Sequence, residues 1–368
     1  MQKTNQKRNS NIELLRVISM LMIVLAHLLI KTSALWEVNS DRPVYYISWL
    51  LYALCLTSVN CYVLISGYFG TESRFKFDRL IRIYFQVLFY SVGIAVIMRI
   101  CHFDLKDGWL NVLLPITRRE YWFATVYLGL YCLTPFLNLA LKNISEKQLR
   151  QLLLVLGVLF CVIPTCLYAD NWLEDGGAYG IVWFVFLYLT GGYIKKYYAD
   201  GRKKSGFYYL ISILILPVSK IIVILIGKIN IISAMLSETT ISKISELLYS
   251  LNSLPITCAS VFLFLFFCSI EIKSESVSKI INFTGSLTFG IYLIHNNRNL
   301  SGPLWEGTRI NYWLAEKENI WVILAIWIVV FIVCAAIEWI RQRLFALLRI
   351  DKLAVRLADF IQRIVPSA

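Results

Sequence analysis

Two side chains in the first apolar stretch of the chain, Arg16 and His27, are of types that can do chemistry. They are eleven residues apart, close to three turns of an α-helix, so both project from nearly the same helix face about 16 Å apart along the axis. Both are costly in lipid. Because a neutral imidazole accepts a proton near neutral pH, His27 is a candidate general base. The alternative is an imidazole that only hydrogen-bonds a neighbouring helix.

Glu13 lies one helix turn before Arg16 and can pair with it, which would lower the cost of burying either charge. A simpler role for Arg16 is that of an anchor at the membrane surface. Its position inside the apolar stretch, and the face it shares with His27, count against that role.

A second pair of basic side chains, Arg79 and Arg82, opens another apolar stretch and shares one helix face. The guanidinium fork suits phosphate oxygens, so this pair is a candidate clamp for the phosphates of a cytoplasmic ligand. The alternative is a basic flank that orients the helix in the membrane.

Aromatic residues and a further histidine complete the candidates. Tyr121 and Trp122 open one apolar stretch, and Tyr292 and His295 lie near the end of another. They could line a site for a sugar or a donor molecule. The alternatives are an aromatic belt at the membrane surface and a histidine with a local hydrogen bond. We expect no functional role for His102.

Membrane-spanning helices must position these residues. The chain has 368 residues, of which 58% are hydrophobic and 16% charged, whereas soluble proteins carry about 25% charged residues. Several apolar runs reach the ~20 residues that cross a hydrocarbon core. We therefore predict an all-α fold, a polytopic transmembrane helix bundle forming one integral-membrane domain over residues 1–368. The ten predicted spans are 11–33, 44–70, 79–101, 121–141, 148–168, 179–198, 206–227, 248–270, 279–297 and 319–346.

The basic residues predict the orientation of these spans. Most of the 36 Lys and Arg side chains fall in alternate connecting segments and in the two ends of the chain, which places both termini in the cytoplasm. The same rule accounts for the net charge of +13, so we expect no nucleic-acid partner. Segment 347–364 alternates basic and apolar residues at helical spacing and is predicted as an amphipathic helix on the inner leaflet.

Some kinds of chemistry are absent from the sequence. The nine cysteines lie almost all inside apolar runs and form no C-x-x-C pair, so we expect small core residues rather than disulfides or metal ligands. There is no P-loop, G-x-S-x-G, H-E-x-x-H or D-x-D pattern. We therefore expect neither ATP hydrolysis nor a metal cofactor.

In their order and predicted topology, these motifs resemble the membrane-bound acyltransferase family 3, bacterial proteins that acylate, often O-acetylate, cell-surface glycans. The resemblance extends over essentially the whole chain. Cys61 and Tyr62 depart from it, since they stand where aromatic Phe pairs are usual. The stretches that carry it are Arg16-x10-His27, 60–67, Arg79-x-x-Arg82, 121–123 with Pro135-x-x-Asn138, and 286–295.

The resemblance implies transfer of an acyl group, most often acetyl, from cytoplasmic acyl-CoA to a hydroxyl of a cell-surface or lipid-linked polysaccharide at the cell membrane. It implies that the donor phosphates meet Arg79 and Arg82, that the pantetheine arm runs beside the first span, and that His27 takes the proton of the attacking hydroxyl. Arg16 then binds donor phosphate or holds Glu13. The acceptor, the acyl group, direct transfer against an acyl-enzyme, and the oligomeric state stay open.

Two other functions are consistent with a multi-span chain. A transporter or flippase of polyprenyl-linked glycans is expected to carry charges in the middle of several spans, whereas the middles of spans five to eight hold almost none apart from Lys220. A glycan polymerase or ligase is expected to need a large external loop, and segments 99–120, 228–247 and 298–318 are short for that role. The sequence therefore favours the acyltransferase.

Overall fold

The structure is a computed structural model that describes residues 9–106, 108–167, 172–173, 176–227, 229 and 237–364. Its regular secondary structure in those residues is entirely helical. Eight of the described helices are long and apolar enough to cross a membrane. The prediction of an all-α, polytopic membrane fold is confirmed.

The eight long helices account for most of the apolar residues. Each is continuous over at least 21 residues, enough to cross ~30 Å of hydrocarbon at ~1.5 Å per residue. They are α1 (Ser10–Lys31), α3 (Pro43–Gly70), α4 (Phe77–Ile100), α6 (Trp122–Asn143), the run of α7 (Glu146–Gly157), η1 (Val158–Val162) and α8 (Ile163–Leu167), α10 (Ser205–Gly227), α14 (Glu275–His295) and α16 (Ile320–Leu347).

Two further segments predicted as spans form shorter helices, α9 (Ile181–Tyr197) and α13 (Leu254–Cys268). Helix α13 begins six residues later than the predicted span, because Pro255 occupies the first helical turn after Ser253. Membrane crossing by these two helices stays a prediction. The predicted end of the fifth span, residue 168, lies outside the described residues. The remaining short elements are α2 (Ala34–Glu37), α5 (Trp109–Leu113), α12 (Glu238–Glu246), α15 (Arg298–Gly307), η2 (Gly177–Tyr179), η3 (Leu247–Tyr249) and η4 (Tyr312–Glu316).

The chain forms two compact units, each assembled from separate parts of the sequence. The first contains Met1–Ala26, Ser40–Phe69 and Asn143–Ser286, and the second contains His27–Asn39, Gly70–Lys142 and Leu287–Ala368. Helices α1 and α14 therefore each contribute one end to each unit.

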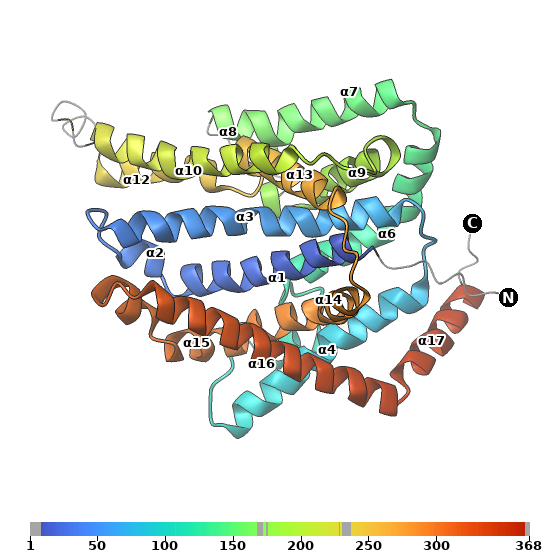
Figure 1. Ribbon diagram of the computed structural model, residues 1–368. Helices are drawn as coiled ribbons and strands as arrows, with labels where there is room; N and C mark the ends of the chain where they lie inside the picture. The colour runs from blue at the N-terminus through green and yellow to red at the C-terminus, as the bar shows by residue number, and fades with distance from the viewer. Residues whose placement is uncertain are drawn as a thin grey trace. The chain divides into compact units, whose positions relative to one another are not determined.

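Within the first unit, helices α3 and α9 approach each other closely. A Cβ atom at Gly67 of α3 would clash with the backbone of Tyr188, and one at Gly191 of α9 would clash with the backbone of Leu64. Small residues let membrane helices pack backbone against backbone, which supplies van der Waals contact where lipid gives no hydrophobic drive. In the same unit α10 lies along α13 (Figure 1).

Within the second unit, the C-terminal helix α17 (Ile350–Ile364) packs against α4 (Figure 1). Its buried residues are Ala354 and Ala358, one turn apart on one face. The chain turns between α16 and α17 at Arg349, which has a left-handed backbone with φ 54°. A helix thus forms within 347–364, and its position on the inner leaflet stays a prediction.

Candidate active site

Two histidines that lie 268 residues apart in the sequence meet in the second unit. His27 Nδ1 of α1 lies 3.0 Å from His295 Nε2 of α14. On its other side His295 Nδ1 lies 2.6 Å from the carbonyl oxygen of Ile291, one turn back along α14. The His295 side chain is fully buried, whereas His27 is half-buried.

The partners of these imidazoles define which nitrogen carries each proton. A carbonyl oxygen can only accept, so His295 Nδ1 must donate to Ile291, and a neutral His295 then presents a lone pair at Nε2. His27 Nδ1 must in turn donate to that lone pair. A neutral His27 is left with its lone pair on Nε2. Protonation there breaks neither hydrogen bond, so the pair suits a group that accepts and returns a proton.

Polar side chains continue from the histidine pair past the end of α14. Lys31, one turn after His27 on α1, donates from Nζ to the side-chain oxygen of Asn296 at 2.6 Å. The side-chain amide of Asn297 donates to the hydroxyl of Tyr121 at 2.7 Å. These residues lie beside the pair because Asn296 and Asn297 directly follow His295 at the end of α14.

Aromatic rings enclose His295. The ring of Tyr292 lies 6.4 Å from His295 and 6.1 Å from Tyr121, measured between centroids, and Trp305 of α15 lies 6.2 Å from His295. The structure thus brings together His27, His295, Tyr121 and Tyr292, which the sequence put forward separately. Trp122 is half-buried, and its ring lies against Phe123 at 5.9 Å.

Glu13 and Arg16 form the ion pair that their spacing allows. An oxygen of Glu13 lies 3.5 Å from the Arg16 guanidinium, in the first unit. The other carboxylate oxygen is buried and accepts no hydrogen bond among the described residues. A Cβ atom at Gly285 of α14 would nearly touch that oxygen, so this glycine makes room for the carboxylate. The Tyr62 hydroxyl donates to the Arg16 carbonyl at 2.9 Å, so the departure from the Phe pattern adds a contact to α1.

The two arginines at the start of α4 have different partners. Arg79 lies over the ring of Tyr131, with 5.4 Å from its guanidinium carbon to the ring centroid. Arg82 contacts two carboxylates, Asp78 at 2.6 Å and Asp351 of α17 at 3.3 Å. A phosphate bound by both arginines would therefore compete with these carboxylates for the donors of Arg82. These contacts are largely exposed to solvent, where an ion pair contributes only ~0–1 kcal/mol.

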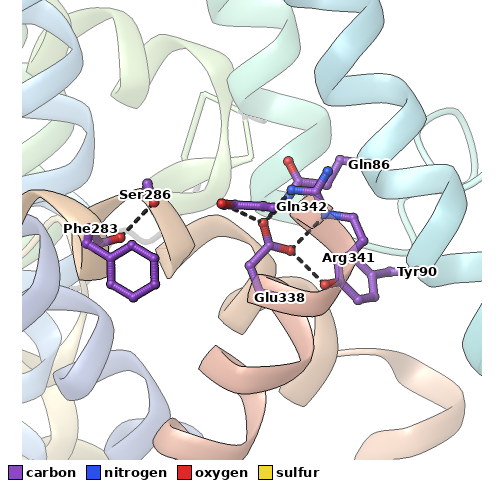
Figure 2. Close-up of polar contacts among 7 residues, drawn as sticks. All are labelled: Gln86, Tyr90, Phe283, Ser286, Glu338, Arg341 and Gln342. Carbon is purple, nitrogen blue, oxygen red and sulfur yellow. Dashed lines mark hydrogen bonds and ion pairs between the residues drawn. The ribbon is translucent and has the colours of Figure 1, made fainter. Parts of the chain in front are cut away.

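A buried carboxylate that the sequence reasoning overlooked lies on α16. Glu338 is fully buried and accepts hydrogen bonds from several side chains, as Figure 2 shows. Its neighbour on α14 is Gly290, where a Cβ atom would clash with the carboxylate. A carboxylate within the predicted span 319–346 is costly in lipid, so its position alone indicates that it pairs with other polar groups. The donors are Tyr90 at 2.6 Å, Gln86 at 3.3 Å, Gln342 at 3.0 Å, and Arg341 at 2.5 and 3.0 Å.

The thiols and possible metal ligands add no further site. All nine cysteines are free thiols. In the described residues, no three His, Cys, Asp or Glu side chains gather as they would around a metal ion.

Comparison with known proteins gives one match. No curated protein and no solved structure matches the chain. The family model described as an acyltransferase domain, acyltransferase 3, matches residues 9–339. That range includes every candidate residue discussed above, and it covers most of the chain. The protein is therefore a multi-pass membrane acyltransferase that belongs to acyltransferase family 3.

Proposed function

We propose that the protein transfers an acyl group, most often acetyl, from cytoplasmic acyl-CoA to a hydroxyl group of a cell-surface or lipid-linked glycan. The observation that carries the proposal is the pair of consecutive hydrogen bonds that connects the Ile291 carbonyl to His295 and His295 to His27. It leaves the Nε2 lone pair of His27 available to take the proton of an acceptor hydroxyl while the oxygen attacks the thioester carbonyl. The proton then passes to the departing CoA thiolate.

His295 is the positioning residue in this proposal. Because its Nδ1–H is held by a carbonyl of its own helix, its ring orientation is defined by α14. It accepts from His27 both before and after His27 is protonated, which fixes the ring of the base. Tyr121, Trp122 and Tyr292 are proposed to form part of the wall against which the acceptor or the acyl group lies.

The donor phosphates are proposed to bind Arg79 and Arg82 at the cytoplasmic side of the cell membrane. Arg79 keeps its cation–π contact with Tyr131 while its outer donors face phosphate. Arg82 exchanges Asp351 for phosphate, an exchange of one exposed ion pair for a charge-assisted contact. Arg16 is proposed to hold Glu13 or to bind donor phosphate, on the same helix as the base.

Glycan analysis in cells tests the proposal. In a strain that lacks the protein, restoring the wild-type chain should restore O-acyl groups on one of its surface glycans, whereas His27→Ala should not. His102→Ala is the matched control. His102 is exposed, lies just after the end of α4, and has no proposed role in the reaction. Equal acylation of all glycans in the deleted and restored strains would contradict the enzyme proposal. Accumulation of unexported glycan would instead favour a transporter or flippase.

A binding assay tests the donor site separately. Acetyl-CoA should bind the purified protein carrying Arg79→Ala and Arg82→Ala more weakly than the wild type, because two phosphate donors are lost. Succinyl-CoA and other short acyl-CoA donors can be compared in the same assay. Unchanged acetyl-CoA affinity in the double variant would place the phosphates elsewhere.

A further inference from the structure

Several basic side chains gather next to the histidine pair, and the proposed chemistry does not use them. Lys31 of α1, Lys106 of the segment after α4, and Arg298 at the start of α15 all belong to the second unit. Lys106 and Arg298 both lie close enough to Lys31 to interact with it electrostatically. All three side chains are exposed. We refer to Lys31, Lys106 and Arg298 as the basic cluster.

Specific contacts hold the basic cluster in place. Lys106 donates from its backbone N–H to the side-chain oxygen of Asn299 at 3.0 Å. Its ammonium group lies against the backbone of α15 at Gly302, where a Cβ atom would come within 3.0 Å of it. Arg298 donates from its backbone N–H to Glu120 at 3.2 Å.

Two buried donors beside the basic cluster have no acceptor among the described residues. These are the side-chain nitrogen Nδ2 of Asn299 and the indole nitrogen of Trp305. Asn299 is 2% exposed and Trp305 is 1% exposed. Asn299 contacts Lys106 through its oxygen, and Trp305 lies against His295. A buried donor without an acceptor is costly, and a bound ligand that carries acceptor oxygens removes this cost.

The charge balance of the region favours an anion. The carboxylates that the contacts identify here are Glu120, which is buried against the start of α15, and Glu306, near Gly302. The three cations of the basic cluster outnumber them. Both the charge and the unused hydrogen-bond donors are therefore complementary to an oxyanion.

We propose that the basic cluster receives the negatively charged group of an acidic acceptor glycan, a carboxylate of a sugar acid or a phosphate of a phosphodiester-linked polymer. The inference rests on the proposed function, because it places the hydroxyl to be acylated at His27 and the anionic group at Lys106 and Arg298. Lys31, one turn from His27 on α1, links the two positions. The acceptor is thus held at the end of α14 and the start of α15, where His295 meets Asn299.

Acyl transfer to three defined soluble acceptors tests this inference with the full-length protein in lipid nanodiscs. The acceptors are a neutral galactose oligosaccharide, a galacturonate oligosaccharide of equal length, and a glycerol phosphate oligomer. Wild-type protein should give a lower KM for at least one anionic acceptor than for the neutral one. Lys106→Gln and Arg298→Gln should each raise that KM about tenfold, the change expected for one lost hydrogen bond to a charged group. Neither should change the KM for acetyl-CoA.

Controls separate charge from structure. Arg298→Lys keeps the charge and should restore most of the lost affinity. Lys317→Gln removes an exposed cation of the same unit that lies at Tyr312 instead, and it should leave all three KM values unchanged. Raising the salt concentration should raise the KM for the anionic acceptor and leave the KM for the neutral acceptor unchanged, because exposed charges are screened.

Three outcomes overturn the inference. They are equal use of neutral and anionic acceptors by wild type, unchanged anionic KM in the Gln variants, and a rise in the KM for acetyl-CoA, which would assign the basic cluster to the donor. Binding of a fluorescent galacturonate oligosaccharide, measured without acetyl-CoA, separates the two proposals. Binding that depends on Lys106 and Arg298, without acyl transfer to any acceptor, supports the anion site and contradicts the proposed function. Acyl transfer with equal KM for neutral and anionic acceptors supports the proposed function and contradicts the anion site.

Discussion

Two polar clusters of the second unit border helix α14 and differ in how completely their hydrogen bonds are satisfied. At Gly290, α14 faces the Glu338 carboxylate, which accepts from four side chains of α4 and α16. Five residues later, at His295, two consecutive hydrogen bonds lead from the Ile291 carbonyl to His27. They leave the Nε2 lone pair of His27 available to accept a proton. Donors on Asn299 and Trp305 near this second cluster have no acceptor in the described residues.

The difference distinguishes a structural from a reactive site. A buried charge with a full set of donors stabilises one arrangement of its helices, and removing one partner leaves an uncompensated charge. Groups whose hydrogen bonds are incomplete have capacity left for a substrate. We therefore expect the Glu338 cluster to determine stability and the histidine pair to determine rate.

The largest expected effect is on the rate after loss of the base. In His27→Ala, kcat should fall by about 10²- to 10⁴-fold, the usual contribution of a general base, while the melting temperature of the purified protein stays close to that of wild type. Kinetics with saturating acetyl-CoA and a thermal melt in detergent measure the two quantities. A His27→Ala protein with a lowered melting temperature and a near-normal kcat would instead assign His27 a structural role.

The opposite pattern is expected for Glu338. Glu338→Ala should lower the free energy of unfolding by about 3–5 kcal/mol, because the buried Arg341 guanidinium loses its partner. The fraction that stays folded should keep a kcat near wild type. The measurement is a thermal melt paired with activity per folded molecule. If kcat per folded molecule dropped a hundredfold, the carboxylate would belong to the reaction.

A smaller effect is expected at the positioning residue. His295→Ala should lower kcat by about tenfold, because His27 loses one hydrogen bond that fixes its ring. His295→Gln, whose side-chain oxygen can accept from His27, should recover part of the rate. Single-turnover kinetics, with enzyme in excess over acetyl-CoA, give the chemical step directly. Identical rates for His295→Ala and wild type would remove His295 from the proposed mechanism.

The smallest effect comes from an exposed pair. Asp351→Asn removes the carboxylate of α17 that contacts Arg82. Exposed pairs contribute about 0.2–1 kcal/mol, so the KM for acetyl-CoA should fall by no more than about fivefold, with kcat unchanged. Glu275→Gln, which removes an exposed ion pair with Lys279 in the other unit, is the matched control. A rise in KM would mean that Asp351 helps the donor to bind.

The features that the sequence predicts are those set by short spacing. The pair between Glu13 and Arg16 follows from one helix turn, and the amphipathic pattern of 347–364 marks the helix at Ile350–Ile364. Composition and the length of the apolar runs establish the all-α membrane fold. All of these features depend on interactions between residues about four positions apart or on contact with the solvent. Predicting them does not require knowing which helices are neighbours.

The features that the sequence does not predict depend on neighbours distant in the chain. His27 and His295 are individually noticeable, yet nothing in their spacing shows that they share a hydrogen bond. Arg79 and Arg82 share a helix face, but their partners come from α6 and α17. Glu338 was visible as a charge in an apolar run, and only its packing against Gly290 shows why it is tolerated.

The close approach of α3 and α9 has a consequence for how the protein is made. Insertion of α3 into the bilayer depends on its own hydropathy, whereas its association with α9 depends on contacts such as those at Gly67 and Gly191. A methyl group at Gly67 would leave insertion intact and block association. Such a chain would enter the membrane in normal amounts and then be removed by membrane proteases. A glycine with no part in the proposed chemistry would therefore control how much enzyme a cell contains.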